Sequence, residues 1–237
     1  MLLEVIAESV ADALEAERGG AHRLELVRDL GVGGLTPSLE VVRNIVGSVS
    51  LPVRVMLRER IDYDGGDDSD RRRLCALAAQ VSELPVDGLV LGFLSGGRVD
   101  LEFTARLLRC APNLKATFHH AFEEVEPFEA IQKLKTLKQV DRILTSGGRG
   151  EWPLKIEKLV RYQRAAGPEI RILVGGGLDI ERIKLLLQKT DLQEFHVGRS
   201  VREPATAEGN VLAETVRTLI DAMHVSSITR EKAEDTV

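Results

Sequence analysis

The chain has 237 residues, of which 43% are hydrophobic and 29% are charged. This ordinary globular usage excludes collagen-like, coiled-coil and disordered chains, and the length suits one large domain or two small ones. The formal net charge of -5 argues against a nucleic-acid partner, and the lack of any run of about 18 uncharged apolar residues argues against a membrane partner.

Short β-rich apolar runs alternate with helix-period segments to about residue 224. Successive runs begin roughly 21 to 35 residues apart, which fits a strand, a crossover helix and two short loops, and therefore parallel pairing. Eight such units predict a (β/α)8 TIM barrel, because a doubly wound sheet usually needs fewer strands. The expected strands are Leu2–Ala7, Arg23–Leu26, Val53–Leu57, Gly88–Leu91, Lys115–Phe118, Arg142–Thr145, Arg171–Val174 and Glu194–Val197.

Polar residues mark the starts of several intervening helices. Ser9, Ser38, Asp100 and Asp179 each precede a helical pattern and can accept a hydrogen bond from its first turn. After about residue 224 the chain has little apolar content. We therefore predict one barrel domain over residues 1–224 and a polar, frayed C-terminal tail over residues 225–237.

The carboxyl ends of barrel strands meet at one face, so polar residues near these ends are the candidates for chemistry. Glu4 and Glu25 lie in the first two strands among apolar neighbours. Two interpretations stay open. Either each glutamate forms a structural ion pair with Arg23, Arg54 or Arg58, or burial raises its pKa so that it acts as an acid or base.

Histidines stand at the ends of two predicted strands. His119 and His120 end the fifth, and because alternate side chains of a strand face opposite ways, we expect only one of them to face the barrel. A histidine there suits proton transfer at neutral pH or a transition metal, and the plainer alternative is a hydrogen-bonded strand end. His196 in the eighth strand is a further candidate by the same logic.

Glycine-rich segments follow the seventh and eighth strands. They contain Gly175, Gly176 and Gly177, and then Gly198, which Arg199 follows. Backbone N–H groups in such loops cradle phosphate, and a helix N-terminus and an arginine add favourable charge. The sequence thus favours a phosphorylated or otherwise anionic ligand, although glycines serve tight turns equally well.

The two cysteines, Cys75 and Cys110, show neither CxxC nor histidine-flanked spacing. No disulfide framework or structural zinc site is indicated, so a reducing cytoplasm is expected. The N-terminal segment shows no basic leader or cleavage site, which also favours a cytoplasmic location. The acidic segment 62–70 lacks an EF-hand spacing, and we expect a solvated loop there.

A series of motifs resembles the CutC family, in order, over about residues 1 to 200: LEV, AERGGAHRLEL, GGLTPS, LPVRVMLR, DGLVLGFL, ATFHHAFE, DRILTSGG, VGGG and EFH. The resemblance implies a TIM barrel, a cytoplasmic location, homo-oligomers and a role in copper homeostasis through copper binding. It also implies a polar mouth, because eight residues match family motif positions. They are Glu4, Arg23, Glu25, Arg58, His119, Thr145, Ser146 and His196.

The chain departs from the family pattern in two places. Members proposed to bind copper resemble LEVC and IELC in their first two strands, where this chain has Ile6 and Val27, so the soft thiolates that select Cu(I) are absent there. Cys75 and Cys110 do not match those positions. The second departure is the segment HVGRSVREP, which is similar to the phosphate-gripping eighth strand of phosphosugar barrels such as the orotidine monophosphate decarboxylase group.

Two functions from different classes stay open, and a non-catalytic binding scaffold is a third. The first is copper homeostasis by copper binding, with copper as the possible cofactor. The second is a lyase- or isomerase-type enzyme for a small anionic or phosphorylated metabolite. The first predicts a metal ion as partner and the second a small-molecule anion, and the resemblance implies a homo-oligomer. We assign catalysis to Glu4, Glu25, Arg58, His119 and His196, ligand binding to Arg23, Thr145, Ser146, Gly175, Gly176, Gly177, Gly198 and Arg199, and a metal to His119 and His120.

Overall fold

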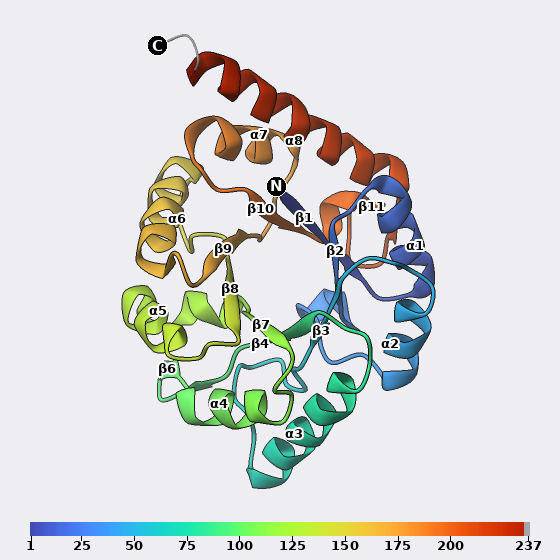
Figure 1. The fold of residues 1–237 in the computed structure, drawn as a ribbon, viewed down its shortest axis with the longest axis vertical. Coiled ribbons are helices and arrows are strands. Elements are labelled where there is room, and N and C mark those ends of the chain that lie inside the picture. Colours follow the sequence, from blue (N-terminus) through green and yellow to red (C-terminus); the bar gives the residue numbers. More distant parts are fainter. Residues whose placement is uncertain (235–237) are drawn as a thin grey trace.

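The computed structural model describes residues 1–234, with side chains described through residue 225. Eight parallel strands close into a barrel in the order β1-β10-β9-β8-β7-β4-β3-β2, and helices surround it (Figure 1). The TIM barrel predicted from the alternation of strands and helices is confirmed. The barrel strands are β1 (Leu2–Ala7), β2 (Arg23–Leu26), β3 (Val53–Met56), β4 (Gly88–Leu91), β7 (Lys115–Phe118), β8 (Val140–Thr145), β9 (Arg171–Val174) and β10 (Glu194–Val197).

Two barrel strands differ from their predicted bounds. Strand β3 ends one residue early, although the N–H of Leu57 still donates to the carbonyl of Val90 at 2.8 Å. Strand β8 begins two residues early, because the register against β7 shifts between Ala116 and Thr117 and β8 carries the extra residue Asp141 there. A bulge of this kind leaves no mark in the apolar pattern on which the prediction rested.

The helices begin where the predicted polar residues cap them. The side chains of Ser9, Ser38, Asp100 and Asp179 each accept a hydrogen bond from a backbone N–H of the first turn. The helices are α1 (Val10–Gly19), α2 (Leu39–Val46), α3 (Asp68–Ser82), α4 (Leu101–Arg109), α5 (Pro127–Lys135), α6 (Trp152–Ala166), α7 (Ile180–Lys189) and α8 (Ala213–Glu234). Two small hairpins extend the loops, β5 (Leu94–Ser95) with β6 (Arg98–Val99) and β11 (Arg202–Glu203) with β12 (Asn210–Val211).

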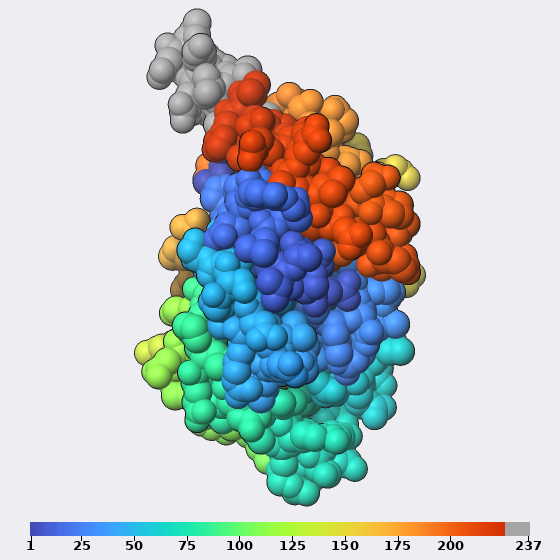
Figure 2. Space-filling model, turned by 90° about the vertical axis from the view of Figure 1, so that its right-hand side faces the viewer, coloured from blue at the N-terminus to red at the C-terminus, as the bar shows by residue number. Residues whose placement is uncertain are grey.

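Helix α8 lies against α1 and α7 on the outside of the barrel (Figures 1 and 2). It continues to Glu234, past the predicted domain boundary at residue 224. The reason is visible in the sequence, since residues 225–234 contain neither glycine nor proline and include several strong helix formers. The last three residues of the predicted tail, 235–237, and the side chains after residue 225 lie outside the described residues.

Alternate side chains of the strands lie in two different environments, one between the barrel and the helices and one inside the barrel. Leu3, Val5 and Leu24 point outward into the main hydrophobic core between barrel and helices. The other face of the strands bears buried charged side chains, among them Glu4 and Arg54, which are at most 1% exposed. The interior of this barrel is therefore unusually polar, because such interiors are ordinarily filled by branched apolar residues.

An ion-pair network fills the amino-terminal end of the barrel around Arg54. Its Nη1 and Nη2 atoms donate to the two carboxylate oxygens of Asp141 at 2.7 and 2.9 Å, and Nη1 also donates to the hydroxyl of Thr117 at 2.8 Å. The Nε atom donates to Asp87 at 2.9 Å. These four hydrogen bonds join the buried guanidinium on β3 to Thr117 on β7, to Asp141 on β8 and to Asp87 just before β4, which makes it a brace between strands.

The peripheral features agree with parts of the sequence interpretation. Most of the acidic segment 62–70 is solvent-exposed, and Asp67 caps α3. Cys75 and Cys110 are free thiols, and they hydrogen-bond each other where α3 meets the end of α4. Burial first, and then this contact, raise the pKa of the Cys75 thiol. Within the described residues, no helix is both long enough and apolar enough to cross a membrane.

Candidate functional site

A cavity of about 450 Å³ opens at the carboxyl ends of the barrel strands. Nine of the residues predicted to form the site line it, and five do not. Glu25, Arg58, His119, His120, Gly176, Gly177, His196, Gly198 and Arg199 line the cavity, whereas Glu4, Arg23, Thr145, Ser146 and Gly175 lie behind or beside it.

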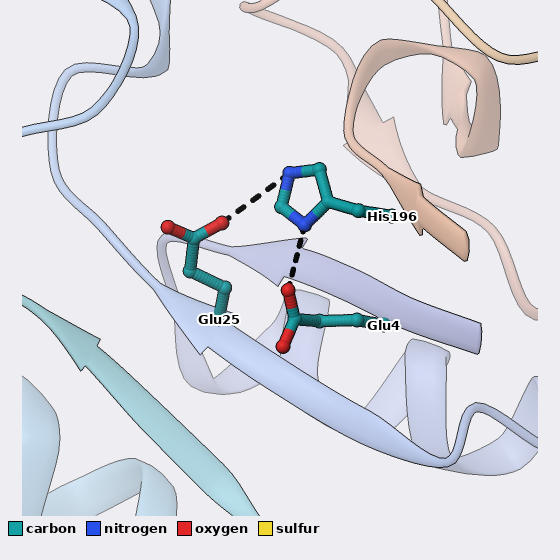
Figure 3. Close-up of side chains that lie close together, drawn as sticks. All are labelled: Glu4, Glu25 and His196. Atoms are coloured by element: carbon teal, nitrogen blue, oxygen red, sulfur yellow. Dashed lines mark hydrogen bonds and ion pairs between the residues drawn. The ribbon is translucent and has the colours of Figure 1, made fainter. Parts of the chain in front are cut away.

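A buried chain of charged groups crosses three neighbouring strands at the base of the cavity. The Nε atom of Arg23 donates to Oε2 of Glu4 at 2.5 Å, and Oε1 of Glu4 accepts from Nδ1 of His196 at 2.7 Å. The Nε2 atom of His196 lies 3.3 Å from Oε2 of Glu25. Figure 3 shows the imidazole between the two carboxyl groups, with the second oxygen of Glu25 turned away from it.

The parallel register explains why these residues meet. In the strand register, Glu4 lies opposite Arg23 on β2 and opposite His196 on β10. Glu25 follows Arg23 by two residues along β2, so its side chain lies on the same face. Side chains 192 residues apart in the sequence thereby become direct neighbours. The ion-pair interpretation is confirmed for Glu4, which pairs with Arg23, and the described contacts show no such pair for Glu25.

The environments of the two glutamates push their pKa values in opposite directions. Burial raises the pKa of Glu4, but the charge of Arg23 and the hydrogen bond from His196 outweigh it and hold the pKa far below its usual range. Burial raises the pKa of Glu25 to about 7; His196 opposes this shift, and the negative charge of Glu4 adds to it. Burial lowers the pKa of His196, but the two carboxylates together raise it above its ordinary value. Near neutral pH this places an anion at Glu4 and an exchangeable proton at Glu25, and it favours the protonated form of His196.

His119 and His120 lie just after the end of β7, so strand alternation does not govern them, and both line the cavity where only one was expected to face the barrel. His119 is 3% exposed, and its Nδ1 atom accepts the backbone N–H of Ala121 at 3.2 Å. His120 is partly exposed and contacts Glu123 through Nδ1 at 3.2 Å. Both line the cavity, but the described residues that lie close enough together to hold a metal ion are Glu4, Glu25 and His196. The structure therefore gives no support to a metal at the adjacent histidines.

The glycine-rich loops form the wall where an anion was predicted. Gly176 and Gly177 have φ angles of 87° and 78°, in the left-handed region that favours glycine. The N-terminus of α7 follows, where Arg182 pairs with Asp179 at 3.2 Å, and Arg199, which comes just after the neighbouring strand β10, also lines the cavity. Gly175 has a packing role instead, since a Cβ there would lie 2.6 Å from the side chain of Leu144.

Three of the predicted site residues use their polar groups to hold loops in place. The guanidinium of Arg58 donates to the carbonyls of Gly33 and Arg60 at 3.2 and 2.9 Å, so its N–H groups brace the loop at the cavity wall. Thr145 and Ser146 bind the carboxylate of Glu123 through the hydroxyl at 3.1 Å and the backbone N–H at 2.6 Å. We therefore correct the ligand-binding assignment of Thr145 and Ser146, which position a loop behind the cavity.

The two positions at which the sequence lacks cysteine lie in the cavity wall. Ile6 and Val27 pack with Met56 and Val90 in a small apolar cluster, and both line the cavity. Gly198 lies against this cluster, because a Cβ on it would lie 2.8 Å from Ile6. The wall next to Glu25 is thus apolar, which favours the uncharged form of its carboxyl group.

Sequence reasoning missed Tyr63, Arg182 and Ser200, which also line the cavity. Tyr63 lies in the acidic segment, and the guanidinium of Arg58 stacks over its ring at 4.8 Å. Arg182 could have been found, because it stands in the first turn of the helix that follows the glycine run. Ser200 follows Arg199 directly, and its buried hydroxyl has no hydrogen-bond partner among the described residues.

Comparison with known proteins gives consistent results. Residues 1–201 match the CutC family. A CutC family protein of Mesorhizobium japonicum is 36% identical over 211 residues, which cover 86% of this chain and 80% of that protein. The human copper homeostasis protein cutC homolog is 37% identical over 209 residues, 85% of this chain and 75% of that protein. The crystal structure of the putative copper homeostasis protein CutC from Streptococcus agalactiae superposes with a TM-score of 0.77 at 29% identity, covering 84% of this chain and 98% of that one.

Proposed function

The chain belongs to the CutC family, and from that premise we propose that it is an enzyme that moves a proton on a small anionic metabolite, in a lyase- or isomerase-type reaction. One observation carries the proposal. Glu25 lines the cavity, is 1% exposed, and its Oε1 atom is buried without a hydrogen-bond partner among the described residues. A buried carboxyl oxygen without a partner is costly in a purely structural role, and a bound substrate would supply that partner.

The charge chain behind Glu25 supports this role. His196 holds Oε2 of Glu25, and Glu4 with Arg23 holds His196, so the carboxyl group is fixed in orientation. A raised pKa of about 7 lets Glu25 accept and return a proton at neutral pH. Glu4, which the sequence offered as an equal candidate, is a positioning residue here, because it does not line the cavity.

The part of the cavity wall that follows β9 and β10 supports an anionic substrate. The backbone at Gly176 and Gly177, the N-terminus of α7 and the side chain of Arg199 surround one side of the cavity. Helix N-termini and glycine-rich backbone bind phosphate through their N–H groups. Because Arg182 pairs with Asp179, we base the test on Arg199.

Replacing Arg199 by alanine is expected to abolish stabilisation of the metal-stripped protein by phosphate and sugar phosphates. In wild type, a ligand at ten times its Kd adds about 1.4 kcal/mol to the free energy of unfolding, which is roughly 3–6 °C in Tm. Thermal-shift curves measured with chelator present test this. Arg164 on α6 is also exposed and lies outside the cavity lining, so Arg164→Ala is the matched control and should keep the shift. An unchanged shift in Arg199→Ala would remove this loop from the proposal.

Copper binding is the second candidate, and a specific cluster favours it. Potential ligand atoms of Glu4, Glu25 and His196 lie within 4.8 Å of one another, and all three residues are buried. Two carboxylates and one imidazole suit a divalent ion such as Cu(II), whereas Cu(I) is selected by soft thiolates. Bound copper would have to displace the contacts that now join His196 to both glutamates.

The two possible donor sets for copper predict different mutant behaviour. If the Glu4, Glu25 and His196 cluster binds Cu(II), Glu25→Gln should weaken the affinity by at least about tenfold, since even outer-sphere partners are worth that much. His120→Gln should leave the affinity unchanged. Competition titrations of the metal-stripped protein with Cu(II) measure both. Copper affinity lost in His120→Gln and kept in Glu25→Gln would instead support the histidine pair predicted from the sequence.

A further inference from the structure

The hydrogen bond at His119 fixes which nitrogen of its ring carries the proton. Nδ1 faces the backbone N–H of Ala121 at 3.2 Å, and a backbone N–H can only donate. Nδ1 is therefore the acceptor, and the proton of the neutral ring lies on Nε2. Burial, and next the charge of Arg58, lower the pKa of His119 well below its ordinary value, so the ring stays neutral.

Among the described residues, no atom accepts a hydrogen bond from the Nε2 N–H of His119. The Nε2 atom is buried, although the residue belongs to the cavity wall. The ring is held in place between Tyr63 and Phe118, whose ring centroids lie 5.2 and 6.2 Å away. A rigid N–H that lacks an acceptor in a cavity wall indicates that the ligand supplies the oxygen.

We propose that Nε2–H of His119 donates to the carbonyl oxygen of the substrate, and that the substrate class is an enolisable carbonyl compound with an anionic end. This inference rests on the proposed function, because it names the group on which proton transfer by Glu25 acts. A neutral N–H suits an oxygen that gains charge only during the reaction, whereas a permanent anion is better held by arginine.

The step balances without a co-reactant. The Glu25 carboxylate takes the proton from the carbon next to the carbonyl, and the electron pair of that C–H bond forms the C=C bond. The carbonyl π pair moves onto oxygen, which gives an enolate held by Nε2–H of His119. If the deprotonated carbon carries a hydroxyl, that hydroxyl passes its proton to the enolate oxygen and becomes the new carbonyl while Glu25 returns its proton to the former carbonyl carbon, which completes an isomerisation. If the next carbon carries a leaving group, the enolate oxygen re-forms the carbonyl, a C=C bond forms to that carbon, and the group departs with its electron pair and the proton of Glu25, which completes an elimination.

Binding of two phosphate compounds tests the carbonyl assignment. Phosphoglycolohydroxamate mimics an enediolate and carries a phosphate, whereas glycerol 3-phosphate has the phosphate without the enolate-like oxygens. We expect calorimetry on the metal-stripped protein, with chelator present, to give at least tenfold tighter binding of the hydroxamate. His119→Ala should remove this difference and leave glycerol 3-phosphate binding unchanged. Equal affinities in wild type would overturn the carbonyl assignment while the anion site stands, and no binding of either compound would overturn the proposed function as well.

Nitrogen-15 NMR of wild-type protein gives a second test that does not depend on the folding of a variant. The spectrum of His119 should show a protonated Nε2 and an unprotonated Nδ1 in the free protein. The Nε2–H proton should move downfield when the hydroxamate binds. A proton on Nδ1, or an Nε2–H signal that the hydroxamate leaves unchanged, would overturn the inference.

Discussion

Replacing Glu25 by glutamine is expected to slow proton exchange between the substrate and solvent by two to four orders of magnitude, which is the usual contribution of a positioned general acid or base. Glutamine keeps the shape of the side chain and an oxygen for His196, but it cannot accept the proton. The measurement is incorporation of deuterium into a panel of sugar phosphates in D2O, followed by proton NMR. Glu129→Gln is the matched control, because Glu129 on α5 lies outside the cavity lining.

The pH dependence of the same reaction follows from the environment of Glu25. The base must be ionised, so the wild-type rate should rise as the pH increases through about 7 and then level off.

The free energy of unfolding, measured as a function of pH, tests the same pKa independently of activity. The native state keeps a proton on Glu25 that the unfolded state releases near 4.5, so wild-type stability falls as the pH rises from 4.5 to about 7, whereas this contribution is absent in Glu25→Gln. Relative to Glu25→Gln, wild type should therefore lose on the order of 3 kcal/mol of stability between pH 4.5 and about 7. Parallel pH dependences of the two stabilities, with exchange intact in the variant, would contradict the assignment of Glu25.

The strand pattern and helix caps were sufficient to predict the barrel, because local apolar runs and polar caps are fixed by near neighbours in the sequence. Six of the strands have the predicted bounds, and the difference at β8 arises from a bulge opposite Ala116 and Thr117 that no local pattern records. The C-terminal helix was predicted too short, since its loss of apolar periodicity does not break a helix that lacks glycine and proline.

The sequence predicted many of the residues of the candidate site but not the contacts between them. Position at a strand end predicted His119, because barrel topology sends every strand end to one mouth, whereas Glu25 was predicted together with Glu4 as a charged residue among apolar neighbours within a strand. The contact of Glu4 with His196 spans 192 residues and depends on the register of β1 against β10, which the sequence does not state. The same argument applies to Thr145, whose place at a strand end suggested a ligand but whose hydroxyl contacts Glu123.

Replacing Arg54 by leucine is expected to lower the free energy of unfolding by about 3–5 kcal/mol, because removing one partner of a buried ion pair leaves the other without compensation. Arg54 is 1% exposed and joins β3 to Asp141, Thr117 and Asp87. Urea unfolding at pH 7 measures the loss. Arg54→Lys keeps the charge but cannot form the paired bonds to Asp141, so it should lie between wild type and the leucine variant.

Two further measurements separate loss of the ion pair from loss of packing. The double variant Arg54→Leu with Asp141→Asn should recover part of the stability, because the half-buried carboxylate that is left with Arg142 alone is then neutralised. Burial alone would raise the pKa of Asp141, but Arg54 holds it below its ordinary value of 3.8. The ion pair thus stabilises the native state above that pH and loses its contribution as the pH falls through the lowered pKa. The stability gap between wild type and Arg54→Leu should therefore narrow on acidification, and a gap independent of pH would assign the effect to packing alone.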